Sequence, residues 1–211
     1  MASLTSARPP FARFALLGVV AALLAAVPAS LAGAQQRAPR ALSVGVGGGG
    51  TVPVGDFAND VKTGWNVLGF FQYQPVAEGP WAVRAEAQYH RASYTDDFLS
   101  DVGASPGDDL RNSVLYVGAS ALFHLNAGTG VRPYVIGGLG LYELTASITD
   151  DNGISTSDSE SGFGFNGGVG LRFGGPVAFF VETRFHQFSI TPTGGVKSTS
   201  RFIPVSIGVS F

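Results

Sequence analysis

The 211-residue sequence contains no cysteine and few charged residues, and both shortages exclude classes of protein. Without cysteine there is no disulfide framework, thiolate metal site, cysteine nucleophile or lipid-modified cysteine anchor. Charged residues make up only 13% of the chain, and its formal net charge of −2 provides no basic surface for nucleic acid. We therefore expect no nucleic-acid partner.

Long apolar segments are also scarce, since only one occurs and it lies near the N-terminus. Residues 1–13 carry Arg8 and Arg13 without an acid, and residues 14–28 are almost entirely apolar. Ala32-Gly33-Ala34 then provides the small residues of a cleavage site. About 15 apolar residues fall short of the roughly 20 that a spanning helix needs. We predict a signal peptide over 1–34, a lead-in over 35–40, a mature domain over 41–211 and export through the Sec pathway.

The mature segment is rich in glycine and aromatic residues, and apolar side chains recur at every second position. In residues 81–90, Trp81 and Val83 alternate with Arg84 and Glu86. This period of two indicates β-strands with two different faces. Eight runs of roughly ten residues are found, which is the length that a tilted strand needs to cross a bilayer. They cover residues 42–50, 65–74, 81–90, 115–125, 133–143, 163–173, 179–186 and 203–211.

The connections between these runs alternate in length. Short turns are expected at 75–80, 126–132 and 174–176, and long polar loops at 52–64, 95–111, 144–162 and 188–200. An even number of strands with short turns on one side and long loops on the other is typical of bacterial outer-membrane barrels. The predicted fold is therefore an all-β, eight-stranded antiparallel transmembrane barrel.

Alternation alone does not tell which face is outside, because a soluble, lipocalin-like carrier has the same period with the faces reversed. Lipid outside is favoured because the polar face carries charges and many glycines, whereas the predicted strands contain no lysine. Aromatic residues also recur at the run ends, where the interfacial girdles of a membrane barrel lie. A soluble carrier remains the alternative.

The chain resembles the small outer-membrane β-barrel family of eight-stranded OmpA-like, OmpX-like and opacity-type proteins. The resemblance covers nearly all of residues 41–211, and it rests on residues 52–57 (VPVGDF), 132–142 (RPYVIGGLGLY), 180–185 (FVETRF) and the alternating C-terminal run. It implies a bacterial outer-membrane location among lipid and lipopolysaccharide, and a monomer. This barrel supports structural, adhesive and enzymatic members, so the resemblance does not specify a function.

The resemblance also implies contacts with periplasmic chaperones and the barrel-assembly machinery during biogenesis. In the family, this machinery reads a C-terminal aromatic residue preceded by apolar residues at alternate positions. The matching residues are Ile207, Val209 and Phe211.

Charged side chains on the polar face are predicted to form an ion-pair network in the lumen, because an unpaired charge there would be costly. Eight strands leave an interior that side chains just fill, so the network is expected to rigidify the barrel. A narrow gated pore is the alternative. The predicted members are Arg84, Glu86, Arg172, Glu182 and Arg184.

The three histidines, His90, His124 and His186, also lie on the polar face, where we expect hydrogen bonding rather than metal binding or catalysis. Outer-membrane lipid A acyl hydrolases use a histidine and a serine two residues apart on a lipid-facing strand. Here His186 and Ser189 are three apart, which puts them on opposite faces. We therefore predict a non-enzymatic protein without cofactor, with a structural role in the envelope or a surface interaction through its loops with an unknown ligand. A lipid A acyl hydrolase is the enzymatic alternative.

Overall fold

The computed structural model describes residues 41–76, 79–101, 109–125, 130–149, 155–190 and 197–211. The predicted signal peptide over 1–34 and lead-in over 35–40 lie outside these residues, as do parts of the loops. Neither described helix has the length and apolarity that a helical membrane span requires.

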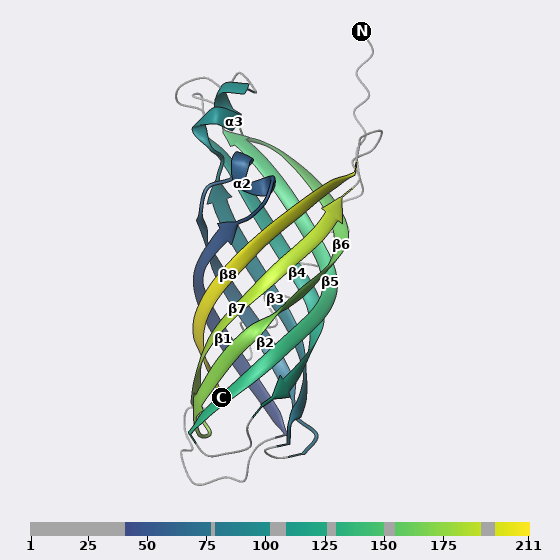
Figure 1. Cartoon of the computed structure of the whole chain (residues 1–211). Helices are drawn as coiled ribbons and strands as arrows, with labels where there is room; N and C mark the ends of the chain where they lie inside the picture. Colours follow the sequence, from purple (N-terminus) through teal and green to yellow (C-terminus); the bar gives the residue numbers. More distant parts are fainter. Residues whose placement is uncertain (1–40, 77–78, 102–108, 126–129, 150–154, 191–196) are drawn as a thin grey trace. The chain divides into compact units, whose positions relative to one another are not determined.

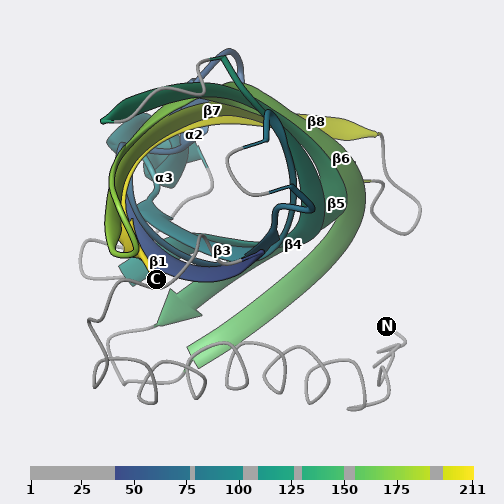
Figure 2. The same cartoon turned by 90° about the horizontal axis from the view of Figure 1, so that it is seen from below.

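Eight antiparallel strands form a closed ring in which each strand pairs with its neighbours in the sequence (Figures 1 and 2). Strand β1 closes the ring by pairing with β8, from Gly45 opposite Ser210 to Pro53 opposite Phe202. The predicted fold is thereby confirmed. The strands are β1 (Leu42–Pro53), β2 (Gly64–Tyr73), β3 (Trp81–Ser93), β4 (Asp109–His124), β5 (Val131–Thr149), β6 (Ser155–Gly174), β7 (Ala178–Ile190) and β8 (Ser198–Ser210).

The two ends of the barrel differ. The loop end carries the short helices α2 (Phe57–Asp60) and α3 (Asp96–Asp101), whereas the turn end carries the short connections and the C-terminal Phe211 (Figure 1). In the loop-end connections, Val61 pairs with Tyr94, and Lys62 donates to Asp96 at 2.9 Å. The first two long connections therefore contact each other.

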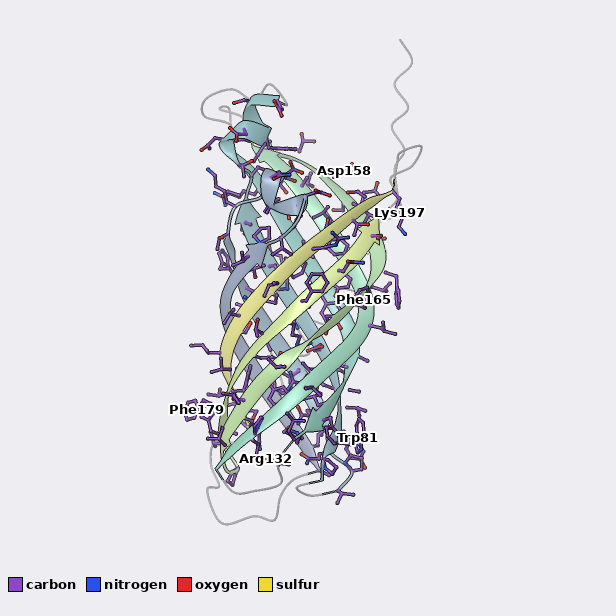
Figure 3. All side chains as sticks on the ribbon, viewed as in Figure 1. Trp81, Arg132, Asp158, Phe165, Phe179 and Lys197 are labelled. Atoms are coloured by element: carbon purple, nitrogen blue, oxygen red, sulfur yellow. The ribbon has the colours of Figure 1, made fainter. Side chains whose placement is uncertain are left out.

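The outer face is apolar and the inner face is largely polar, as the alternation predicts. Trp81, Leu141 and Ile207 are each at least 60% exposed on the outside. Trp81 and Phe179 extend outward near the turn end, and Phe165 lies on the outside further toward the loop end (Figure 3). Inward positions instead hold buried polar side chains, among them Asn66, Gln72, Gln88 and Asn166. This distribution suits a barrel surrounded by lipid, which offers no hydrogen bonds to polar groups.

The β5–β6 hairpin is longer than the sequence pattern predicts. Residues 144–162 were expected to form a polar loop, but β5 continues to Thr149 and β6 begins at Ser155. The strands stay paired there, and the Thr145 and Ser159 hydroxyls lie 2.9 Å apart across the hairpin. The prediction was wrong because apolar alternation ends where the outer face becomes polar, while serine and threonine still form cross-strand pairs.

Two other predicted loops are likewise shorter than expected. Strand β7 ends at Ile190 and β8 begins at Ser198, inside the predicted loop 188–200. Strand β4 begins at Asp109, inside the predicted loop 95–111.

Glycines on the inner face allow the strands to curve tightly around a narrow lumen. A Cβ atom at Gly168 would overlap the Thr183 carbonyl oxygen and would lie 2.6 Å from the Arg184 Cα. A Cβ atom at the neighbouring Gly167 points outward and comes no closer than 3.8 Å to the Ile136 carbonyl oxygen. Adjacent glycines in the same strand therefore have opposite tolerance for a side chain.

We predict that Gly168→Ala lowers the free energy of unfolding by about 1–3 kcal/mol, because the added methyl group overpacks the inner wall. Gly167→Ala is the matched control and should leave stability unchanged or slightly higher. Urea unfolding in lipid vesicles, followed by tryptophan fluorescence, measures the difference. Equal stability of the two variants would contradict the close inner packing.

Candidate functional site

Four charged side chains meet in the middle of the lumen. Arg84 and Glu86 are two residues apart on β3, and Glu182 and Arg184 are two apart on β7, so both pairs point inward. Strands β3 and β7 are four places apart in a ring of eight, which puts them on opposite walls. All four side chains are buried.

The four charges form a continuous chain of ion pairs across the lumen. Arg84 Nη1 lies 2.8 Å from Glu182 Oε2, and Arg184 Nη1 lies 2.6 Å from Glu86 Oε1. Arg184 Nη2 also contacts Glu182 Oε1 at 2.6 Å. Two positive and two negative charges therefore balance one another within a set of direct contacts.

Neutral polar groups satisfy much of the remaining hydrogen-bonding capacity of this network. Ser120 donates to Glu86 at 2.5 Å, and Tyr134 donates to Glu182 at 2.7 Å. The Gln72 side-chain oxygen accepts from Arg84 at 3.0 Å, and the Asn166 oxygen accepts from Arg184 at 3.2 Å. Buried charges become tolerable only with this kind of compensation, because each loses its hydration.

An aromatic ring supports one end of the network. The Arg84 guanidinium lies 3.9 Å from the centroid of the Phe70 ring, and Phe70 itself packs edge-on against Phe180. A guanidinium over a ring face adds a cation–π attraction. The ring also restricts the rotamers of Arg84, so the network has a defined geometry.

Arg172, the fifth predicted member, lies elsewhere. Gly170 is the residue opposite Glu182, while Arg172 lies opposite Phe180, one inward position nearer the turn end. The Arg172 Nη2 donates to the Gly175 carbonyl at 3.4 Å. Arg132 on the neighbouring strand β5 is the direct cross-strand partner of Arg172. Residue spacing gives the face of a side chain but not the register between strands, so the sequence alone could not tell which charges Arg172 would meet.

Sequence reasoning missed the neutral partners of the network, namely Gln72, Ser120, Tyr134 and Asn166. All four lie at inward positions of their strands and are buried. The alternation that predicts inward positions for the charges predicts the same for these four residues. Their polar side chains on the inward face could therefore have identified them as hydrogen-bond partners of the charges.

Two histidines and several aromatic rings fill the lumen between the charges and the loop end. His90 Nδ1 lies 2.9 Å from Thr51 Oγ1, and His186 Nδ1 lies 3.0 Å from Tyr142 Oη. The two imidazoles are 5.8 Å apart, and both contact the Phe202 ring. His124 lies toward the turn end, beside Tyr134.

The loop end of the lumen is covered by the first long connection. Phe57 of α2 packs against the buried cluster that contains Val114, Phe188 and Phe202. Beneath this cover is a mostly apolar cavity of about 20 Å³ that adjoins His90. A cavity of this size holds about one water molecule, so it is no ligand chamber.

The middle of the lumen is therefore packed, and its two arginines and two glutamates balance one another in charge. His186 is fully buried inside, whereas Ser189 lies at an outward position and contacts the Thr199 hydroxyl at 3.0 Å. The two do not form a nucleophile–base pair. No cluster of three or more histidine, cysteine or acidic side chains suited to a metal ion occurs in the described part of the chain.

The residues of the proposed assembly signal lie at the C-terminal end of β8. Ile207 is 63% exposed on the outer face, and Phe211 exchanges two backbone hydrogen bonds with Val44 of β1, at 2.8 and 3.1 Å. The C-terminal residue is thus part of the seam that closes the ring.

Comparisons with known proteins agree on the fold. The family model for the outer membrane protein beta-barrel domain matches residues 19–211. The structure of Neisserial surface protein A is 17% identical, with a TM-score of 0.52, covering 81% of this chain and 96% of that one. A major outer membrane protein from Thermus thermophilus is 11% identical, with a TM-score of 0.54, covering 82% and 99%. None of the curated proteins matches the chain.

We predict that Glu182→Gln lowers the free energy of unfolding by about 3–5 kcal/mol, because it leaves two buried guanidinium groups short of negative charge. Asp96→Asn is the control, since the Lys62–Asp96 pair is largely exposed and should contribute little. Unfolding in urea measures both. A loss for Glu182→Gln no larger than that for Asp96→Asn would show that the lumenal pairs do not stabilise the barrel.

Proposed function

Because the chain belongs to the outer membrane protein beta-barrel domain family, we propose that it acts at the bacterial surface by presenting its loop end to a partner, without catalysing a reaction. The protein is located in the bacterial outer membrane, among lipid and lipopolysaccharide. The alternative of a soluble carrier is therefore wrong, because the apolar face of the strands is on the outside of the barrel.

The observation that carries this proposal is the extension of the β5–β6 hairpin at the loop end. Strand β6 pairs with β7 only from Phe163 onward, so from Ser155 to Gly162 its sole strand partner among the described residues is β5. We call residues 144–149 and 155–162 the ribbon. Asp158 lies at this end of the barrel (Figure 3).

The chemistry of the ribbon suits recognition. Thr156, Ser157 and Asp158 are exposed. Among the described residues no strand pairs with the side of β6 away from β5 over 155–162, so we expect its backbone groups there to be able to pair with an added strand. Such an edge binds an extended peptide through main-chain hydrogen bonds, while side chains supply the selectivity. In outer-membrane barrels the long connections face outward from the cell, so the ribbon is accessible to extracellular partners.

A structural role in the envelope is the second candidate, and the lumenal network favours it. The lumen is filled by ion pairs between opposite walls and by packed aromatic rings, so it is not an open channel. Such a protein contributes to the envelope through its outer face, whatever its loops contact.

We predict that shortening the ribbon separates these two functions. In the variant, residues 147–157 are replaced by Asn-Gly, which joins the paired residues Ala146 and Asp158 by a two-residue turn. A deletion strain is complemented with the wild type or the variant, and adhesion to protein-coated surfaces and detergent resistance are measured. The surface role predicts that the variant lacks adhesion but restores detergent resistance. Normal adhesion with the variant would reject it.

We further propose that Ile207, Val209 and Phe211 are recognised by the assembly machinery during insertion. Phe211→Ala keeps the backbone bonds to Val44 but removes the aromatic ring, so we expect less protein in the outer membrane. The measurement is the amount of outer-membrane protein whose gel mobility changes on boiling. Phe173→Ala, which removes an aromatic ring elsewhere near the turn end, is the control, and equal losses in the two variants would argue against a specific signal.

A further inference from the structure

A row of outward-facing residues crosses five strands at the loop end of the barrel. Arg91 of β3 is the cross-strand partner of Trp65 on β2 and of Ser113 on β4. Ser113 pairs in turn with Thr145 on β5, and Thr145 pairs with Ser159 on β6. We call these five residues the boundary row. Neighbouring strands lie about 4.8 Å apart, so the row is roughly 20 Å long.

The boundary row runs from the edge of the apolar outer face into a polar region. On β2 and β3, the next outward residues toward the turn end are Val67 and Tyr89, and the Tyr89 ring lies 5.7 Å from that of Trp65. On β5 and β6, the corresponding residues are Glu143 and Ser161. Strands of membrane barrels are tilted, so a row across them climbs along the barrel axis. One end of the row therefore meets lipid, and the other lies beyond the apolar band.

Among the described strand residues, cations on the outer face occur only at the loop end. Arg91, Arg111 and Arg201 occupy outward positions there, whereas Arg132 and Arg172 at the turn end point inward. Aromatic residues take outward positions at the turn end, namely Tyr73, Trp81, Phe123, Phe173 and Phe179. The two boundaries of the apolar band are therefore chemically different, and on the described strands only the one at the loop end offers positive charge to a neighbouring molecule.

Arg91 is the cation of the boundary row, and it is partly exposed. Arg111 lies on the same face nearer the loop tips, but it interacts within the protein, so it is not counted as a donor to a ligand. A guanidinium presents planar N–H groups that match two oxygens of a phosphate. The hydroxyl groups of the row and the Glu143 carboxylate are donors and acceptors for sugar hydroxyls. Trp65 is of the type that lies at a lipid–water interface. This combination fits a lipid headgroup that contains both phosphate and sugar.

We propose that the boundary row binds the phosphorylated sugar headgroup of a glycolipid in the outer leaflet, with Arg91 on a phosphate group and the hydroxyl groups of Ser113, Thr145 and Ser159 beside the sugars. The loop end of outer-membrane barrels faces away from the cell, so the lipopolysaccharide of the outer leaflet adjoins the row. A location among lipopolysaccharide requires only an apolar outer face, whereas the row specifies a place on the barrel and a headgroup. The row uses the outward face of the ribbon, and the proposed surface role uses the ribbon edge, so either can fail without the other.

The two tryptophans of the chain provide a reporter at each boundary, since Trp65 belongs to the row and Trp81 lies near the turn end. The Trp81→Phe chain, folded in neutral maltoside micelles, is titrated with bis-phosphorylated lipid A while the emission of Trp65 is recorded. We expect a saturable change in this emission. Phosphatidylglycerol, which carries a phosphate but no sugar, should cause a much smaller change. The Trp65→Phe chain, in which only Trp81 emits, should not respond to lipid A.

Adding Arg91→Gln to the Trp81→Phe chain should raise the lipid A needed for half of the emission change about tenfold or more, because a charge-assisted hydrogen bond is lost. Arg201→Gln is the matched control, since it removes an outward arginine at the loop end that lies outside the row and bonds Gln187 at 2.8 Å. This variant should titrate like its parent. The gel shift on boiling confirms that each variant is folded.

Several results would overturn the assignment. No saturable change with lipid A, or an equal change in Trp81 emission, would mean that the row does not bind the glycolipid. An equal response to phosphatidylglycerol would mean that charge alone is recognised, without the sugar. A folded Arg91→Gln that titrates like its parent, or an equal weakening by Arg201→Gln, would likewise reject the row as the site. Adhesion through the ribbon edge is measured separately, so these results leave the surface role untouched.

Discussion

The need to pair every backbone polar group inside lipid is the constraint on which the rest of this structure depends. A bilayer offers no hydrogen bonds, so a strand can remain there only with a partner on each side. Pairing of β1 with β8 meets this requirement by removing the last two edges. Closure with eight strands then leaves a lumen only wide enough for side chains. The curvature explains why the inner wall excludes even a Cβ atom at Gly168, while the outer wall accepts one at Gly167.

A narrow lumen in turn determines how charge can be accommodated. The two arginines and two glutamates at its centre cannot reach bulk water, so they must neutralise one another. Their contacts run between β3 and β7, which connects opposite walls. Aromatic rings and glycines fill the space around them. The interior is thus occupied by packed side chains, and the exposed polar residues of the ribbon lie at the loop end.

Much of the fold follows from the alternation of side chains, and so do the inward positions of Arg84, Glu86, Glu182 and Arg184. The period of two identifies the face of each residue without knowledge of its neighbours. Arg172 shows the limit of this reasoning, because its contacts depend on register, which places Gly170 rather than Arg172 opposite Glu182. The ribbon shows another limit, since strands beyond the lipid have no reason to alternate in polarity. The long β5–β6 pairing could not be read from a sequence of serine, threonine and aspartate.

The cross-lumen pairs also have a consequence for how the chain acquires its structure. Arg84 and Glu182 are separated by 98 residues, and so are Glu86 and Arg184. A chain that has inserted only its first four strands would hold Arg84 and Glu86 in a low-dielectric environment without their long-range partners. A partly inserted barrel is therefore unfavourable for two reasons: its edge strands have unpaired backbone groups, and its buried charges have no partners. Contacts between such distant residues slow folding, and here they also favour a concerted process in which insertion, closure and charge neutralisation finish together.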